Sequence, residues 1–175
     1  MPERINPGTA EWGTFGFEHL QRYYFAARFC QQKRVADVGC GSGYGSEILS
    51  VGGATHVLGV DKDEESIRGA RQNVAREGRV DFLSGAIGEA SLAMKVKERG
   101  VDVVVALEIW EHLGNAEALV DFARAVLPTG CLLVASTPNA LQFSRHPQRP
   151  IRNELDRKST RLNSSHVSES RMPSS

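Results

Sequence analysis

Three side chains able to carry acid–base or metal chemistry lie within five consecutive residues. Glu108, Glu111 and His112 directly follow the almost wholly apolar stretch Val101–Leu107. If this segment is helical, Glu108 lies three positions before Glu111 and four before His112, so all three side chains can point into one cleft. His112 could then act as a general base toward an attacking hydroxyl, or the three could bind a divalent ion that lowers the pKa of that hydroxyl. A helix cap with its hydrogen-bond network is the alternative, and the pattern leaves all three readings open.

A second group of residues has the spacing of a nucleotide-binding loop. Gly39, Gly41 and Gly43 alternate with other residues immediately after a short apolar run. Such a turn lets the backbone approach a nucleotide closely, although the pattern alone is a weak signal. Tyr44 stands where the third glycine of the commonest dinucleotide fingerprint would fall. Asp37, two residues before the loop, would repel a pyrophosphate but tolerate a ligand that carries an ammonium group.

An acidic residue at the end of the next predicted strand narrows the chemical class of the ligand. Asp61 ends a second predicted strand about 20 residues after the loop, where a carboxylate can accept hydrogen bonds from both ribose hydroxyls. An adenosyl ligand with a ribose and a cationic amino-acid tail therefore fits Asp37, the glycines and Asp61 together. The alternative role for Asp37 is to cap the backbone amides of the loop.

Strands and helices alternate along the chain in an order that would bring these groups to one edge of a sheet. The predicted strands are Arg34–Val38, His56–Val60, Val80–Leu83, Val101–Leu107 and Cys131–Ser136. The predicted helices are 17–29, one through Ile48 and Leu49, one capped by Asp63, one at Ala90–Lys97 and one opening at Asn115. The first helix would turn Phe17, Leu20, Tyr24 and Ala27 to a common face. Five alternations predict an α/β fold with a Rossmann-like doubly wound parallel sheet.

Four ordered motifs resemble the class I S-adenosylmethionine-dependent methyltransferases. They are Val35–Gly43, Val60-Asp61, Glu108–Leu113 and Ser136–Asn139. The most similar subgroup is the type 11 branch, which includes the ubiquinone-pathway O-methyltransferases. The leading segment, with Glu18–Tyr23, looks like bacterial members associated with glycan-biosynthesis genes. The resemblance covers about residues 3–145 and is specific for fold and cofactor, not for substrate.

The resemblance implies S-adenosylmethionine as the cofactor and assigns residues to its parts. The glycine loop would contact the methionine moiety, Asp61 the ribose, Ala86 and Ile87 the adenine, and Leu107 the region of the sulfonium. Ala86 departs from the acid that many relatives carry at this position, so backbone groups would have to read the adenine amino group. Arg22 and Tyr23 would either cover the cofactor as a lid or pack the first helix.

The implied activity is methyl transfer to a small-molecule acceptor, at an oxygen of a sugar, a glycan precursor or a quinone-like compound. The Glu-x-x-Glu-His arrangement also resembles the metal site of small-RNA 2′-O-methyltransferases and ubiquinone-pathway enzymes, which would make Glu108, Glu111 and His112 ligands of Mg²⁺. Three alternatives stay open. They are a metal-assisted RNA 2′-O-methyltransferase, an NAD-dependent oxidoreductase, which Tyr44 and Asp37 disfavour, and a non-catalytic cofactor-binding domain.

Charge and hydropathy disfavour nucleic acid and membrane as partners. The chain has 175 residues, with 21 basic and 21 acidic side chains, and so no net charge to attract a polyanion. No apolar run approaches the ~20 residues that span a bilayer. The start of the chain lacks the apolar core of a secretory signal. We therefore expect a soluble cytoplasmic protein.

The predicted organisation is a helical lid segment over residues 1–32, a cofactor-binding core over 33–150 and a tail over 156–175. The tail is rich in serine and has few apolar residues, which predicts disorder. Residues 156–166 and 170–175 also resemble an in-frame translation of a common sequencing-library adapter. We expect the natural sequence to stop near Leu155 and to lack the C-terminal strand pair of the family. The fifth strand would then be an uncovered edge, and the chain as written would bind its cofactor weakly or be inactive.

Overall fold

The computed structural model describes residues 10–74, 78–115, 117–138 and 168–171. Its elements follow the predicted alternation. The helices are α1 (Ala10–Cys30), α2 (Tyr44–Val51), α3 (Glu64–Asn73), α4 (Ala90–Glu98) and α5 (Ala118–Val126), with a 3₁₀ turn η1 (Trp110–His112). The strands are β1 (Arg34–Val38), β2 (His56–Asp61), β3 (Val80–Ser84), β4 (Val103–Leu107), β5 (Leu132–Ser136) and β6 (Ser168–Arg171). No helix in these ranges is long and apolar enough to cross a bilayer.

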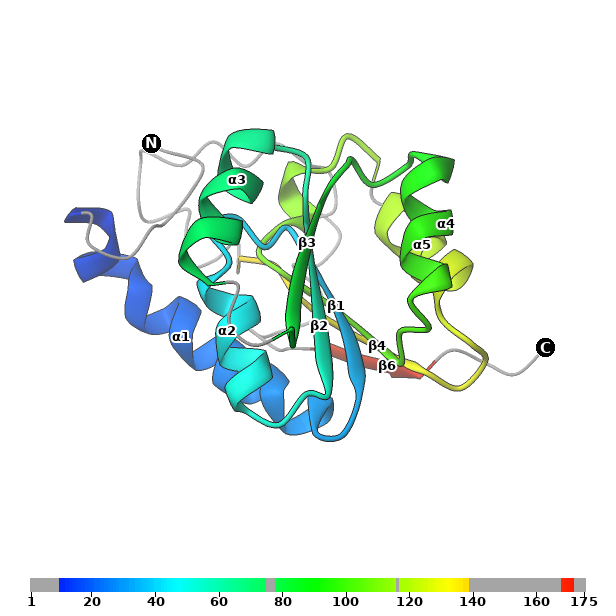
Figure 1. Cartoon of the computed structure of the whole chain (residues 1–175), viewed down its shortest axis with the longest axis horizontal. Helices are drawn as coiled ribbons and strands as arrows, with labels where there is room; N and C mark the ends of the chain where they lie inside the picture. The colour runs from blue at the N-terminus through cyan, green and yellow to red at the C-terminus, as the bar shows by residue number, and fades with distance from the viewer. Residues whose placement is uncertain (1–9, 75–77, 116, 139–167, 172–175) are drawn as a thin grey trace.

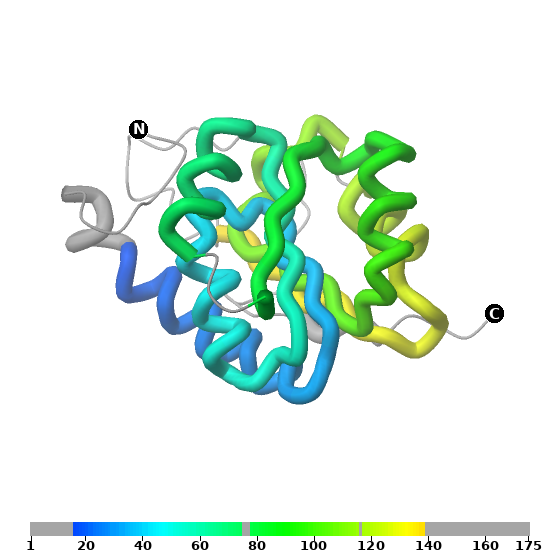
Figure 2. Tube along the Cα trace, in the orientation of Figure 1, coloured from blue at the N-terminus to red at the C-terminus, as the bar shows by residue number. Residues whose placement is uncertain are grey.

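The strands form one sheet in the order β3-β2-β1-β4-β5-β6. β1 to β5 are parallel, and the order reverses between β1 and β4, which confirms the doubly wound fold. Figure 1 shows α1, α2 and α3 on one face of the sheet and α4 and α5 on the other, and the trace in Figure 2 follows the same three layers. All five side chains of β4 are buried because helices cover both faces of this central strand.

A hydrophobic core lies on each side of the sheet. The first core joins β-strand side chains such as Val35 and Val105 to Ile67 of α3 and to the buried face of α1. The second joins Val104 and the strands beside it to Leu119 of α5 and its neighbours. These two cores fix the carboxyl ends of β1, β2 and β4 relative to one another, which is what a site at this edge requires.

The first helix is longer than predicted, and of the four residues predicted to share a face only Ala27 is buried. Phe17 and Tyr24, which share a face by spacing, are 70% and 62% exposed. The buried residues are Tyr23, Ala26, Ala27 and Cys30. Small side chains at 26, 27 and 30 let the helix lie close to α2, so close packing rather than apolar content decides which face turns inward.

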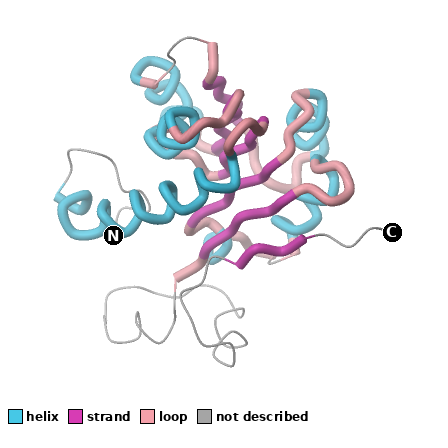
Figure 3. The backbone as a smooth tube through the Cα atoms, turned by 90° about the horizontal axis from the view of Figure 1, so that it is seen from below, coloured by secondary structure: helices cyan, strands magenta, loops and turns pink. Residues whose placement is uncertain are grey.

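Four residues of the predicted tail belong to the sheet. β6 pairs antiparallel with β5, Leu132 facing Arg171 and Ala135 facing Ser168, and the edge-on view in Figure 3 shows it at the rim of the sheet. The structure therefore differs from the expectation of an uncovered β5, because residues 168–171 pair with its outer edge. The expected disorder of the tail over 156–175 stays a prediction. The rest of the tail, and the motif residue Asn139, lie outside the described residues.

Candidate active site

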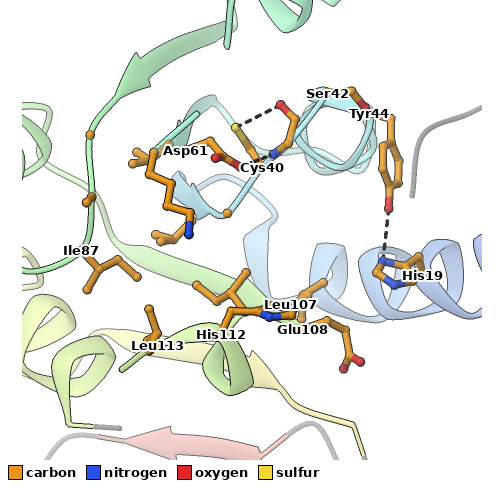
Figure 4. A pocket seen from close by; sticks show the side chains of 18 of the residues that line it. His19, Cys40, Ser42, Tyr44, Asp61, Ile87, Leu107, Glu108, His112 and Leu113 are labelled. Carbon is orange, nitrogen blue, oxygen red and sulfur yellow. Dashed lines mark hydrogen bonds between the residues drawn. The ribbon is translucent and has the colours of Figure 1, made fainter. Parts of the chain in front are cut away.

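A cavity of about 320 Å³ opens where the strand order reverses. In open α/β sheets, ligands bind in this crevice at the carboxyl ends of the strands. The cavity lies against the loop after β1, the ends of β2 and β4, and one side of α1. Figure 4 shows Asp61 and Ile87 toward one end and His19 with Tyr44 at the other. The site therefore has two distinct ends, and its residues come from elements far apart in the sequence.

The glycine loop forms as the spacing predicted. Gly39, Gly41 and Gly43 have φ of 77°, 53° and 83°, a left-handed backbone that other residues adopt at a cost. A Cβ on Gly39 would collide with Ile109, whereas a Cβ on Gly41 would meet nothing within 4 Å. Gly39 and Gly41 line the cavity, while Gly43 is buried and begins α2. The loop thus leaves open space directly beside its backbone at Gly41.

Asp61 connects the loop to the end of β2. Its Oδ2 accepts the backbone N–H of Gly41 at 2.9 Å, and its Oδ1 accepts that of Asp63 at 2.9 Å. Asp63 in turn caps α3 by accepting the N–H of Ser66 at 2.8 Å, as predicted. Asp61 also lines the cavity, where a carboxylate can accept hydrogen bonds from ligand hydroxyls.

Asp37 occupies a different place from the one predicted. It is fully buried and does not line the cavity; its carboxylate accepts the hydroxyls of Ser46 at 2.6 Å and Tyr23 at 3.3 Å. Burial raises the pKa of Asp37 to about 6, against the lowering effect of these two hydrogen bonds. This corrects the expected ligand contact, because Asp37 supports the loop from behind and ties it to α1 and α2.

The predicted adenine residues lie at the end of the cavity where Asp61 is found. Ala86 and Ile87 line it after β3, and Leu113 lines it from the loop after η1. Lys62, next to Asp61, also lines the cavity and was not singled out from the sequence. Leu107, at the end of β4, lines the space between the two ends.

The carboxylate–histidine segment does not form the helix that would bring its three side chains to one face. Glu108 adopts φ 57°, a left-handed backbone, and the 3₁₀ turn begins only at Trp110. The Glu108 carboxylate accepts the hydroxyl of Ser136 at 2.8 Å and pairs with Arg22 at 3.3 Å. Glu108 and His112 line the cavity, and Glu111 does not. The helical spacing assumed for these residues is therefore wrong.

A metal centre does not assemble from these residues. Within the described part of the chain, no three His, Cys, Asp or Glu side chains are placed to hold a metal ion. Glu108 is engaged by an arginine, and Glu111 Oε1 lies 3.9 Å from His112 Nε2. The residues present do not fit Mg²⁺, which corrects the predicted ligand set of Glu108, Glu111 and His112.

Glu111 has the most unusual acid–base environment near the cavity. Burial, together with repulsion from Glu108, raises the pKa of Glu111 to about 7. The hydroxyl of Thr137, 3.4 Å away, and the charge of Arg22 act in the opposite direction. Glu111 therefore changes its charge near neutral pH, one residue from the histidine that lines the cavity.

Two further cavity residues were given no role in the site by the sequence analysis. His19 lines the cavity, and its Nδ1 lies 3.3 Å from the hydroxyl of Tyr44. Tyr44 was used only to argue against a dinucleotide. The available signal was the spacing of His19, Arg22 and Tyr23, which places them on one side of a helix.

The loop also contains a polar atom that lacks a partner. Among the described residues, Ser42 Oγ is the buried side-chain oxygen or nitrogen without a hydrogen-bond partner. Ser42 lines the cavity between Gly41 and Gly43. A ligand, a water molecule or a small shift of the loop would supply a partner for this hydroxyl. Together with Asp61 and the space beside Gly41, this fits a ligand that carries both hydroxyls and a polar tail.

Comparison with known proteins identifies the family. The profile described as "Methyltransferase domain" matches residues 35–130, more than half of the chain. The chain belongs to this methyltransferase family. It is 34% identical over 149 residues to a Mycolicibacterium smegmatis protein named "Probable S-adenosylmethionine-dependent methyltransferase", covering 85% of this chain and 55% of that protein. It is 37% identical over 105 residues to the ubiquinone biosynthesis O-methyltransferase of Maricaulis maris, covering 59% and 40%.

A solved structure with the same fold is the N-methyltransferase NodS of Bradyrhizobium japonicum in complex with S-adenosylhomocysteine. The TM-score is 0.59 at 17% identity, covering 81% of this chain and 72% of that one, so the likeness concerns the fold alone. The chain spans about half the length of the curated relatives it matches.

Proposed function

We propose that the cavity binds S-adenosylmethionine and that the protein transfers a methyl group to an oxygen of a small-molecule acceptor. Asp61 carries the proposal, since it lines the cavity at the end of β2 and holds the open glycine loop through the Gly41 N–H. The family match adds the class of reaction. The similarity to ubiquinone biosynthesis O-methyltransferases supports oxygen, in a sugar, a glycan precursor or a quinone-like compound.

Each wall of the cavity has a part in holding the cofactor. Asp61 would accept the ribose hydroxyls, Ala86 and Ile87 would flank the adenine, and Leu107 would lie beside the sulfonium. When bound, S-adenosylmethionine supplies an electrophilic methyl group. The chain's own contribution is to fix the position of that group relative to an acceptor, which by itself removes much of the entropic barrier.

His112 is the proposed general base for the acceptor hydroxyl. It lines the cavity, and its side chain is 43% exposed, so it can be reached both from the cavity and from solvent. Glu111 lies 3.9 Å from its Nε2, and as a carboxylate it would stabilise the imidazolium that forms. The environment of Glu111 makes this support depend on pH near neutrality.

The cofactor assignment is tested by calorimetry on the full chain. S-adenosylhomocysteine should bind, and Asp61→Asn should weaken binding by about tenfold or more, as expected when hydrogen bonds to a charged group are lost. Asp121→Asn, an exposed carboxylate on α5, is the matched control and should bind as the wild type does. Binding of NAD in place of S-adenosylhomocysteine would contradict the proposal and favour an oxidoreductase.

The acceptor assignment is tested by measuring release of S-adenosylhomocysteine with a catechol, a methyl glycoside and a primary amine as probes. The hydroxyl probes should support turnover. His112→Gln should lower this rate by ~10²-fold or more while cofactor affinity is retained, because only proton removal is lost. Turnover with the amine but not with either hydroxyl probe would refute transfer to oxygen.

A further inference from the structure

Arg22 of α1 reaches the residue that follows β4. Its Nε lies 3.3 Å from Glu108 Oε1, and the two side chains are 22% and 9% exposed. Its Nη2 lies 3.6 Å from the carboxylate of Glu18, one turn earlier on the same helix. Arg22 lies outside residues 35–130, which match the family profile, so that match assigns it no role.

The Glu108 oxygen that faces Arg22 has two partners. Oε1 accepts the hydroxyl of Ser136 at 2.8 Å and pairs with the guanidinium. A carboxylate oxygen has two lone pairs, and these two donors engage both. Divalent cations bind carboxylate oxygens at about 2.0–2.6 Å. At this oxygen a cation would therefore have to displace Arg22 and overcome the repulsion of its charge.

The charge of Arg22 also reaches the second carboxylate of the segment. Burial and the charge of Glu108 raise the pKa of Glu111, and the charge of Arg22 lowers it. One cation therefore offsets two carboxylates, and Glu111 lies 3.9 Å from His112 Nε2. Without Arg22, the same side chains would have the charge and the ligand types that attract a divalent ion.

The contact with Arg22 also holds the backbone that leads to His112. Glu108 adopts φ 57°, an unfavourable conformation for a residue with a side chain. Its N–H donates to Ser136 O at 3.0 Å, and its carboxylate is held by Ser136 and Arg22. The turn Trp110–His112 starts two residues later. Arg22 thereby ties this turn to α1.

We propose that Arg22 takes the place of a divalent cation at Glu108 and positions the turn that carries His112, so that proton removal needs no metal ion. The positioning part rests on the proposed function. Arg22 acts through Glu108 and is therefore a positioning residue. Exclusion of a cation depends on the charge of Arg22, whereas its packing depends on size, and this difference allows a test.

Electron paramagnetic resonance of Mn²⁺ measures cation binding to the full chain. Arg22→Gln should bind Mn²⁺ about tenfold more tightly than the wild type, because a competing positive charge is removed. Arg22→Lys keeps the charge and should behave as the wild type does. Arg28→Gln, at an exposed arginine of the same helix, is the matched control and should show no gain. The gain should disappear when Glu108→Gln is added to Arg22→Gln.

Three results would overturn the exchange of a cation for Arg22. They are wild-type affinity in Arg22→Gln, an equal gain in Arg22→Lys, and a gain that persists without the Glu108 carboxylate. Mn²⁺ binding by the wild type that Glu108→Gln abolishes would overturn it as well, and this measurement needs no variant of Arg22.

Turnover with the catechol or methyl glycoside probe tests the positioning role. EDTA should leave the wild-type rate unchanged, and Arg22→Gln should lower kcat by about tenfold without changing the KM for S-adenosylmethionine, with partial recovery in Arg22→Lys. Inactivation of the wild type by EDTA, or an effect of Arg22→Gln on KM alone, would contradict this role. A wild-type chain that does not bind S-adenosylhomocysteine would instead refute the proposed function, whatever its Mn²⁺ affinity.

Discussion

Glu108 and Glu111 are two carboxylates in one small region, and their surroundings give them different chemistry. Arg22 and Ser136 hold the side chain of Glu108 as an ion-paired and hydrogen-bonded acceptor. Glu111 has the weaker partners Thr137 and His112, and the negative charge of Glu108 adds to its burial. Glu108 is therefore suited to pair with a cation or to fix the local backbone, whereas the charge of Glu111 is suited to change with pH.

Replacing Glu111 by glutamine should stabilise the protein above neutral pH. The pKa of Glu111 is raised from 4.5 to about 7 in the folded chain, so between these values the folded state holds a proton that the unfolded state has lost. Wild-type stability therefore falls as pH rises through this window, and Glu111→Gln should lack the fall. The gain in free energy of unfolding should be absent below pH 4.5 and reach ~1–3 kcal/mol above pH 7.

Urea denaturation at several pH values measures this difference. Glu98→Gln, an exposed glutamate at the end of α4, should differ from the wild type by the same small amount throughout. A Glu111→Gln gain that is equal at pH 4 and pH 8 would show that burial and Glu108 do not set the proton affinity of this carboxyl.

The sequence predicted the residues whose roles depend on neighbours along the chain. The glycines, Asp61 and the Asp63 cap take their places because each strand end leads directly into its loop. His19 and Glu108 could not be assigned in this way. Their partners, Tyr44 and Arg22, lie on helices whose docking is decided by packing across the whole first core.

At the scale of the elements, Tyr23 is one of the buried residues that hold α1 in place. The ring of Tyr23 lies over Gly45 of α2, edge-on to Tyr44 with ring centroids 5.6 Å apart, and its hydroxyl donates to Asp37. A Cβ on Gly45 would occupy the space of the Tyr23 ring. This glycine is therefore required by the docking of α1, despite its cost inside a helix.

Two glycine-to-alanine substitutions in neighbouring helices separate the cost of displacing Tyr23 from the gain in helix propensity. Gly45→Ala should destabilise the protein by ~1–3 kcal/mol, because Tyr23 must leave its place. Gly69→Ala, in α3, meets nothing within 4 Å and should stabilise by up to ~1 kcal/mol through helix propensity. Urea denaturation compares them, and in a Tyr23→Ala background Gly45→Ala should lose its cost. A Gly45→Ala variant as stable as Gly69→Ala would show that Tyr23 does not dock there.

The sequence predicted the bounds of the strands more accurately than the conformation of the segment after β4. β1 has the predicted bounds Arg34–Val38, and β5 starts one residue later than predicted, because buried apolar runs between turns leave little choice. For the segment 108–112, the sequence analysis considered a helix, which would have placed its charged side chains on one face. The segment is not helical because the N–H of Glu108 donates to the carbonyl of Ser136 at 3.0 Å, which extends the pairing of β4 and β5. The backbone of Glu108 then adopts a left-handed conformation.

At the scale of the whole molecule, β3 and β6 are the two edge strands of the sheet. Among the described residues, the outer edge of β5 is covered by the four residues of β6. An apolar strand such as Leu132–Ala135 with an unpaired edge is a template for association with another chain. The solution behaviour of the chain should therefore depend on these four residues.

Ending the chain at Leu155 should promote self-association. Sedimentation velocity at increasing concentration should show larger species for the shortened chain than for the full one, since the backbone groups of β5 lose their partners. Glu169→Pro and Ser170→Pro test the pairing without shortening. Adjacent residues of a strand alternate in which side their N–H groups face, so one of the two prolines removes a donor toward β5. Ser159→Pro, outside β6, is the control and should behave as the full chain does. Identical sedimentation of the shortened and full chains would show that β6 does not protect this edge, and the expected association would then have to be abandoned.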